Sequence, residues 1–244
     1  MQDLPVRRAL VTGGSRGIGA AIARRLARDG CTVTITYHSN SSAADELVAD
    51  IASTGGVAYA LQADTANLHA SMASVDQAAE LMGGLDILVC NAGVSVAAPF
   101  LETGPDMYDA LFDITRGTFF AMQRAGQIIA DHGRIVAIST LGTRRVSSSP
   151  AYCASKTAIE QFCKGLAYEV APRGITVNAV LPGFTETDML ASLPADFKAT
   201  MVGMTAMGRL GKSDEIAALV AFLVSSDGGW VTAETISANG GVKP

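Results

Sequence analysis

The stretch “TGGSRGIG” at residues 12–19 follows the apolar run “ALV” and leads directly into “AAIARRLARDG”. The apolar run predicts a buried β-strand, and the segment after the glycines has the periodicity of a helix. Glycines at such a junction permit positive φ angles and let a phosphate approach the N–H groups at the helix N-terminus. The spacing GxxxGxG is not the dinucleotide-binding GxGxxG, so the stretch alone predicts either a phosphate cradle or an ordinary glycine-rich turn.

Short β-rich runs alternate with helical segments along the rest of the chain. The expected strands are “RALVT”, “TVTITY”, “VAYAL”, “LDILVC”, “RIVAIST”, “ITVNAV” and “ETISA”, and the expected helices are “GAAIARRLARDG”, “AADELVADIAST” and residues 66–82, 106–130, 152–171 and 213–225. This alternation predicts an α/β fold: a single doubly wound (Rossmann) domain over residues 1–244, with a parallel seven-stranded sheet and helices on both faces. Residues 183–212 are the least regular, and a loop of this length predicts a lid or binding loop.

The composition argues against several classes of protein. A net charge of −5 without a basic run argues against a nucleic-acid partner. No apolar run reaches the roughly 18 residues that a membrane span needs, and the N-terminus lacks the apolar core of a signal peptide. The four cysteines and three histidines show no metal-ligand spacing, so we expect reduced thiols, no metal site and a cytoplasmic protein.

A second motif, “YCASK”, places Tyr152 and Lys156 four residues apart on an expected helix. At this spacing both side chains lie on one face. A phenol titrates near pH ~10, and a neighbouring ammonium stabilises its phenolate, which brings the group toward neutral pH. The spacing therefore predicts a proton-transfer pair, against the alternative of two solvated residues on an exposed helix.

The chain resembles the short-chain dehydrogenase/reductase family from end to end. The matching pieces are the two motifs above together with “QADT”, “NAG”, “IST”, “ITVNAVLPGFTETDM” and “GRLGKSDEIAALVAFLVSSDGGWVTAETISANGG”. “PGFTETDM” and the closing stretch are most similar to bacterial 3-oxoacyl-(acyl-carrier-protein) reductases and their relatives in polyketide pathways. The resemblance implies NADPH-dependent reduction of a ketone, a 3-oxoacyl thioester or polyketide-type carbonyl, to a secondary alcohol. The alternative is a catalytically weak family member that serves as a scaffold or regulatory subunit.

The resemblance also implies roles for three residues. Tyr152 protonates the carbonyl oxygen as hydride arrives from the nicotinamide, and Lys156 lowers the tyrosine pKa and binds the nicotinamide ribose. A serine thirteen positions before the tyrosine binds the substrate oxygen, which gives Ser139. Counting from the start of the strand at Arg134 gives Thr140 instead, because the following loop is one residue short. We favour Ser139 and keep Thr140 open, since either hydroxyl can donate the bond.

One family residue is missing. Members carry Asn three positions before the glycine of “GTFF”, where it holds a water joined to the lysine and completes a proton relay. This chain reads “DITRGTFF”, which puts Ile114 in that position or, after a deletion, leaves Thr115 as the nearest polar group. An isoleucine side chain cannot hold a water, so we expect Thr115 or a backbone carbonyl to replace the Asn in a working enzyme.

The expected cofactor is NADP(H). NAD-binding folds place an acidic residue at the end of the second strand, whereas this chain has “TYHSNSS” there and Arg16 in the glycine stretch, a cation suited to a phosphate. By resemblance, Asp64 lies at the adenine, Asn91 along the ribose and Thr187 near the phosphates. The full expected cofactor-binding set is Gly13, Ser15, Arg16, Gly17, Ile18, Gly19, Ser39, Asn40, Asp64, Thr65, Asn91, Ala92, Gly93, Tyr152, Lys156, Pro182, Gly183, Thr185 and Thr187.

The substrate and the assembly are less constrained. Four arginines are candidates for binding an acidic acyl-carrier protein, or are simply solvated: Arg124, Arg144, Arg145 and Arg173. Four methionines are expected in an adaptable apolar substrate wall, or in the core: Met189, Met201, Met204 and Met207. The family implies a homotetramer, and the strongly apolar “AALVAFLVSSDGGWVTAETI” fits a partner surface.

Overall fold

The structure, a computed structural model, describes residues 6–94, 98–187, 190 and 193–242. Seven parallel strands form one sheet in the order β3-β2-β1-β4-β5-β6-β9. They are β1 (Arg8–Val11), β2 (Thr32–Tyr37), β3 (Val57–Gln62), β4 (Ile87–Cys90), β5 (Arg134–Ile138), β6 (Thr176–Pro182) and β9 (Thr235–Ala238). This confirms the predicted α/β fold. The strand order reverses between β1 and β4, where a doubly wound sheet opens a crevice at its carboxyl edge.

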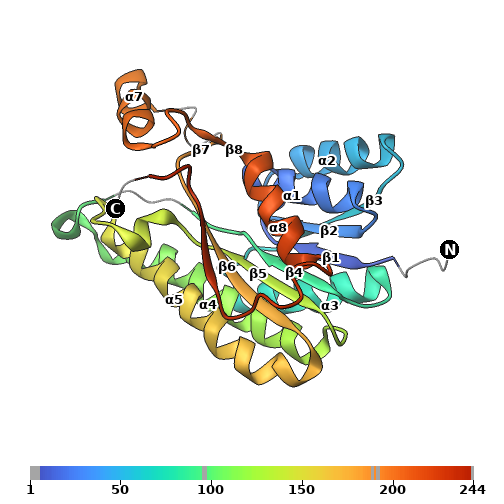
Figure 1. The fold of residues 1–244 in the computed structure, drawn as a ribbon. Coiled ribbons are helices and arrows are strands. Elements are labelled where there is room, and N and C mark those ends of the chain that lie inside the picture. Colours follow the sequence, from blue (N-terminus) through green and yellow to red (C-terminus); the bar gives the residue numbers. More distant parts are fainter. Residues whose placement is uncertain (1–5, 95–97, 188–189, 191–192, 243–244) are drawn as a thin grey trace.

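Helices cover both faces of the sheet (Figure 1). One layer contains α1 (Gly17–Arg28), α2 (Ser41–Ser53) and α8 (Ser213–Val224), and the other contains α3 (Leu68–Met82), α4 (Pro105–Ile128) and α5 (Pro150–Val170). Side chains alternate along a strand, so Ala9 and Val11 of β1 pack under the first layer while Leu10 packs under the second. Buried strands of this kind need an apolar residue at nearly every position, which is why the sequence shows continuous apolar runs.

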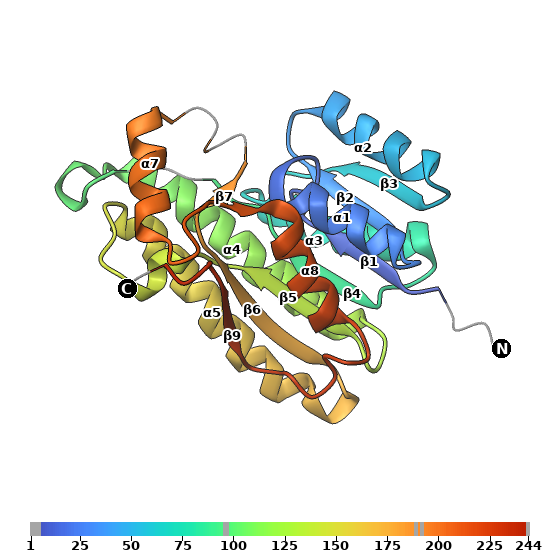
Figure 2. The same cartoon turned by 45° about the horizontal axis from the view of Figure 1, so that its top comes forward.

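The irregular stretch expected at 183–212 contains regular structure. It holds β7 (Thr185–Glu186), α7 (Ala195–Met204) and β8 (Gly211–Lys212), with β7 and β8 paired in parallel. Helix α7 stands off the body of the molecule at the carboxyl edge of the sheet (Figure 2), and none of its described residues is buried. Its apolar residues do not gather on one face, so the sequence carries no amphipathic signal for it.

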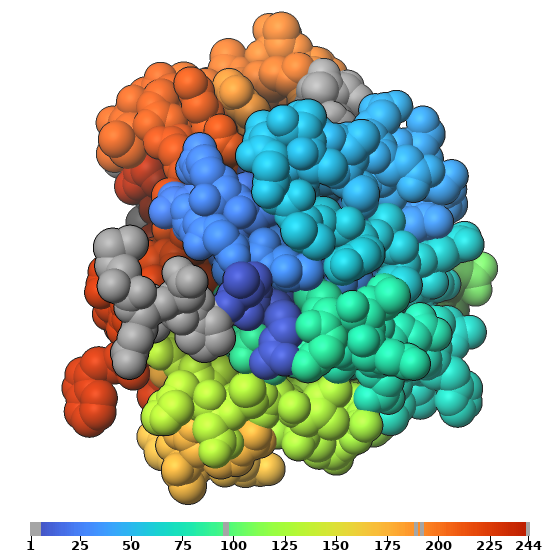
Figure 3. Space-filling view, turned by 90° about the vertical axis from the view of Figure 1, so that its right-hand side faces the viewer, coloured from blue at the N-terminus to red at the C-terminus, as the bar shows by residue number. Residues whose placement is uncertain are grey.

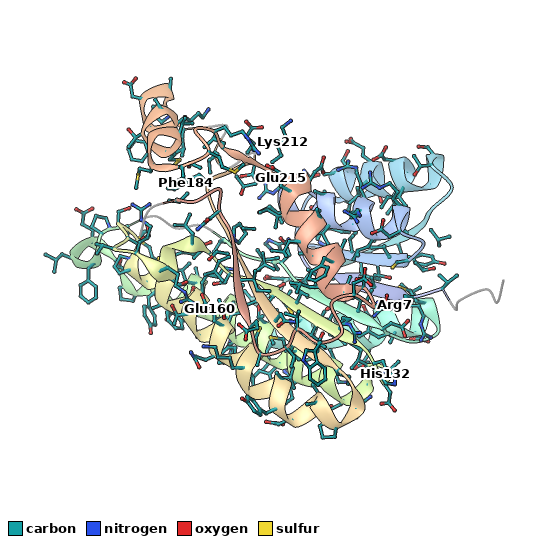
Figure 4. The ribbon with its side chains drawn as sticks, viewed as in Figure 1. Arg7, His132, Glu160, Phe184, Lys212 and Glu215 are labelled. Atoms are coloured by element: carbon teal, nitrogen blue, oxygen red, sulfur yellow. The ribbon has the colours of Figure 1, made fainter. Side chains whose placement is uncertain are left out.

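The connection from α7 to α8 is held by a carboxylate. Glu215, in the first turn of α8, accepts two hydrogen bonds from the Arg209 guanidinium, at 2.7 and 2.8 Å. It also accepts one from the backbone N–H of Lys212 at 2.8 Å (Figure 4). The Arg209 guanidinium and these hydrogen bonds lower the pKa of Glu215 to about 2. The segment that carries α7 is therefore anchored where it rejoins the body.

Helix α4 approaches the turn after β3 backbone to backbone. A Cβ added at Gly117 would overlap the carbonyl oxygen of Thr65. The hydroxyl of Ser71, at the start of α3, donates to the Gly117 carbonyl at 2.9 Å. Glycine at this position therefore sets the distance between α4 and the segment that carries Asp64 and Thr65.

We predict that Gly117→Ala lowers the free energy of unfolding by about 1–3 kcal/mol, the usual cost of overpacking. Gly203→Ala is the matched control, because Gly203 also lies in a helix but has no atom within 4 Å of the added Cβ. Urea denaturation of both variants checks this. Equal stability of the two variants would contradict the close approach of α4.

Candidate active site

The glycine stretch turns sharply at the end of β1. Gly13 and Gly17 have φ angles of 61° and 55°, which side chains other than glycine rarely adopt. A Cβ at Gly19 would overlap the carbonyl oxygen of Gly13. Helix α1 begins at Gly17 with no side-chain cap and no acidic residue in its first turn. Its first N–H groups therefore remain available to an anion, with exposed Arg16 at the N-cap and half-buried Ser15 and Ile18 on either side.

Asn91 braces this turn from the neighbouring strand. Its Nδ2 donates to the carbonyl oxygens of Thr12 and Gly13 at 3.1 and 2.8 Å. In return, the Thr12 hydroxyl accepts from the backbone N–H groups of Asn91 and Ala92 at 3.0 and 3.1 Å. The expectation placed Asn91 along a ribose, and the structure gives it in addition a bracing role between β1 and β4.

The segment after β6 faces the glycine turn. The Thr187 methyl group lies 3.5 Å from the position that a Cβ on Gly17 would take. Behind it, the Thr185 hydroxyl is buried and donates to the Gly183 carbonyl at 3.0 Å, and Pro182 ends β6 in the core. Thr187 therefore lies next to the helix N-terminus, whereas the Thr185 hydroxyl is turned inward.

The end of β2 carries no carboxylate. Ser39 and Asn40 are exposed there, and the Asn40 side chain caps α2 by accepting from the Ala43 N–H at 3.1 Å. Asp64, at the end of β3, accepts from the Ala66 N–H at 2.9 Å, and its other oxygen lies 3.7 Å from His38 Nε2. Asp64 is thus close to the end of β2 but belongs to the neighbouring strand.

Lys156 is buried in the second turn of α5. Its ammonium donates to the carbonyl oxygen of Ile138, the last residue of β5, at 3.0 Å. A Cβ on Gly93 would lie 3.2 Å from the same nitrogen, so the glycine leaves room for the lysine. Burial lowers the pKa of Lys156 to about 8. The ammonium is therefore charged at pH 7 and loses its charge within two pH units above that.

The pKa of Tyr152 is raised, against the expectation. Burial of the phenol is the largest cause, the nearby Cys153 adds to it, and a hydrogen bond with Thr140 opposes it. The Lys156 ammonium is engaged with the Ile138 carbonyl. In this arrangement Tyr152 is a neutral phenol at physiological pH and is able to donate a proton.

The two candidate hydroxyls point in different directions. Ser139 is 4% exposed, and its hydroxyl donates to Oε1 of Glu160 at 2.7 Å. The hydroxyl of Thr140 accepts from the backbone N–H of Gly142 at 3.3 Å, and it is close enough to Tyr152 to oppose the rise of the phenol's pKa. Consecutive residues at a strand end point to opposite sides, so only one of the two can face the phenol. The geometry favours Thr140, the open alternative, over Ser139.

Glu160 is a functional candidate that the motifs did not indicate. It is 2% exposed, lies one turn after Lys156 on α5, and receives Arg144 at 2.7 Å as well as Ser139. A buried carboxylate is costly without partners, and these two partners come from the segment after β5. The signal in the sequence is a carboxylate four residues after Lys156, on the face of α5 that also buries Ile159 and Cys163.

A small cavity lies beside the lysine. Its volume is 10 Å³, about the room that one water needs. Its lining residues are Gly93, Val94, Leu111, Ile114, Thr115, Tyr152, Ser155, Lys156 and Ile159. The Thr115 hydroxyl donates to the Leu111 carbonyl at 3.0 Å, which leaves its oxygen free to accept. Both residues at the missing Asn therefore border the space next to Lys156.

Three of the four candidate surface arginines have internal partners. Arg124 pairs with Asp76 at 2.7 Å. Arg173 pairs with Asp131 at 2.8 Å and also donates to carbonyls at the end of α4. Arg144 is held by Glu160, as described. Of the four methionines, Met201 and Met204 lie on α7 and Met207 follows it, whereas Met189 lies outside the described residues.

Known proteins resemble this chain along nearly its whole length. The family model described as “Enoyl-(Acyl carrier protein) reductase” matches residues 13–243. Acetoacetyl-CoA reductase of Shinella zoogloeoides is 38% identical over 240 residues, covering 96% of this chain and 98% of that protein. The 3-oxoacyl-(acyl-carrier-protein) reductase of Escherichia coli K12 is 38% identical over 239 residues, covering 96% of each. A crystal structure of a short chain dehydrogenase from Burkholderia cenocepacia J2315 in complex with NADP matches with a TM-score of 0.91 at 42% identity, covering 97% of each chain.

Proposed function

Because this chain belongs to the short-chain dehydrogenase/reductase family, we propose that it is an NADPH-dependent ketoreductase that converts a ketone to a secondary alcohol. The substrate is a 3-oxoacyl thioester or a polyketide-type carbonyl, free or tethered to an acyl carrier. The observation that carries the proposal is that Tyr152 and the buried Lys156, one helical turn apart on α5, line the same cavity, with Thr140 beside the phenol. These groups lie at the carboxyl edge of the sheet, where doubly wound folds bind their ligands.

The residues of the crevice fit NADP(H). The helix N-terminus and glycine turn suit a pyrophosphate, and Thr187 lies opposite. Arg16 is exposed at the N-cap without an internal partner among the described residues, and β2 itself ends without a carboxylate, the nearby Asp64 belonging to β3's end beside His38. The relative from Burkholderia cenocepacia was solved with NADP. When bound, NADPH supplies the hydride.

The chain supplies the proton and the orientation. Thr140 donates a hydrogen bond to the carbonyl oxygen of the substrate, and Tyr152 donates its proton to the same oxygen. Because the pKa of Tyr152 lies above that of an ordinary phenol, its proton is in place at neutral pH when the ketone binds. The charged Lys156 stabilises the phenolate that forms when the proton leaves. Above the lysine pKa of about 8 this support is lost, so reduction slows as the pH rises.

Proton resupply is proposed to run without the family asparagine. The cavity between Lys156, Ile114 and Thr115 has room for one water, and the Thr115 oxygen can accept from it. This supports a working enzyme over the alternative of a catalytically weak scaffold, which rests on Ile114 alone.

The proposed state is a cytoplasmic homotetramer. All four cysteines are free, as in a reducing compartment. Trp230 is 98% exposed and Tyr168 80%, which is costly for a monomer. In Figure 3 a red group, from the part of the chain that precedes its C-terminal end, projects from the body of the molecule at the lower left. Sedimentation at micromolar concentration is expected to give four chains per particle, and a monomer would overturn the assembly.

We expect Arg16→Ala to weaken NADPH binding at least tenfold and to change NADH binding less than threefold. Only NADPH carries the 2′-phosphate that the guanidinium can pair with. Titration of intrinsic or nicotinamide fluorescence gives both dissociation constants. Equal constants for NADPH and NADH in the unmodified protein would contradict the assignment.

Thr140→Val and Ser139→Ala separate the two candidate hydroxyls. Thr140→Val removes the donor while keeping the side-chain shape, and kcat is expected to fall by about 10²–10³, as for loss of a donor to a developing oxyanion. Ser139→Ala, whose hydroxyl serves Glu160, is expected to stay within tenfold of the parent. Steady-state NADPH oxidation measures both, and the reverse order would restore Ser139 to the role.

A further inference from the structure

Arg145 follows the short 3-10 turn η2 (Leu141–Arg144) and is half-buried. Its guanidinium carbon lies 5.9 Å from the centre of the Phe184 ring, and its Nη2 lies 3.9 Å from the sulfur of Met204. Phe184 comes directly after Gly183 at the carboxyl end of β6 and lies below α7 (Figure 4), and Met204 is the last residue of α7. The guanidinium thus lies between the loop before Tyr152, the end of β6 and the helix above the crevice.

Among the described residues, no carboxylate pairs with the Arg145 guanidinium. Nη1 of Arg145 is buried and has no hydrogen-bond partner within the described part of the chain. A guanidinium keeps its charge at every physiological pH, and burying a donor without a partner costs free energy. The neighbouring Arg144 lies in the same loop and has the buried Glu160 as its partner.

The three other candidate arginines are committed to Asp76, Asp131 and Glu160. Arg145 is therefore the one among the four that has no acidic partner among the described residues and lies instead against Phe184 and Met204. An aromatic ring and a thioether hold the guanidinium in place without neutralising it. Such a cation is prepared for an anion that arrives with the ligand.

We propose that Arg145 is a specificity residue that binds an anionic oxygen group of the substrate, with its planar fork paired to two oxygens. This rests on the proposed ketoreductase function and narrows its substrate class to ketones that carry a carboxylate or phosphate. Two sources can supply the group: the carboxylate of an oxo acid, or a phosphate on the carrier arm of an acyl thioester. Neutral ketones of the same shape are reduced through the same Thr140 and Tyr152 but are bound more weakly.

Two matched pairs of substrates separate these sources. The first pair is 3-oxohexanoate and its methyl ester, and the second is acetoacetyl-CoA and the neutral N-acetylcysteamine thioester of acetoacetate. Each is assayed by NADPH oxidation with the parent protein, with Arg145→Met and with Arg24→Met. The last is the control for net charge, because Arg24 pairs with Asp50 on the outer surface of α1 and α2.

Arg145→Met is expected to raise KM at least tenfold for the anionic member of one pair and less than threefold for its neutral partner, with kcat for the neutral partner nearly unchanged. Arg24→Met is expected to change neither. A loss confined to the first pair identifies a carboxylate, and a loss confined to the second identifies a carrier phosphate. Equal effects on anionic and neutral members, or no effect on either pair, would overturn the proposal.

The proposed function can fail separately. If the parent protein reduces none of the four compounds, the ketoreductase proposal fails for these substrates, and Arg145 is then tested by binding alone. Titrating the NADPH complex with 3-oxohexanoate and with acetoacetyl-CoA, followed by nicotinamide fluorescence, is expected to show at least tenfold weaker binding of one of them in Arg145→Met. Unchanged dissociation constants for both would overturn the anion site.

Discussion

The hydrogen bond from the buried Lys156 ammonium to the Ile138 carbonyl ties α5 to the carboxyl end of β5. One turn further along α5, Glu160 accepts the Ser139 hydroxyl and forms a second tie to the residue that follows Ile138. Ile138 and Ser139 are both bound to α5, and because side chains alternate along a strand, Thr140 points to the other side from Ser139. The buried charges of Lys156 and Glu160 are tolerated because each has a hydrogen-bond partner.

The same junction links the proposed proton donor, Tyr152, to the proposed anion-binding residue, Arg145. Arg144 completes the partners of Glu160, and the chain then turns so that its neighbour Arg145 lies against Phe184 and Met204. Of these two adjacent arginines, the half-exposed Arg144 pairs with the buried Glu160, whereas Arg145 lies against an aromatic ring and a thioether. Glu160 binds Ser139 and Arg144, which are the chain neighbours of Thr140 and Arg145. We therefore expect a substitution of Glu160 to displace both Thr140 and Arg145.

The fold could be predicted from the sequence, because each strand of the sheet shows an apolar run and most of the helices show apolar residues on one face. The glycine stretch and “YCASK” likewise indicated the correct edge of the sheet. Helix α7 was not predicted because its apolar residues share no face. The choice between Ser139 and Thr140 could not be made because a loop one residue shorter shifts the alignment by one position. Glu160 was not indicated because its partners, Ser139 and Arg144, lie outside α5, and Arg145 could be named only as one of four candidate arginines because its contacts with Phe184 and Met204 are distant in sequence. The raised pKa of Tyr152 depends on the burial of the phenol and on the nearby Cys153, neither of which a motif specifies.

The proposed function requires that Tyr152 gives its proton to a ketone that NADPH reduces. Tyr152→Phe removes that one hydroxyl and leaves the ring in its packing. NADPH is expected to bind with a dissociation constant within threefold of the parent value, while kcat for ketone reduction falls by about 10²–10⁴, the usual contribution of a general acid. If this variant turns over within tenfold of the parent, Tyr152 is not the proton donor.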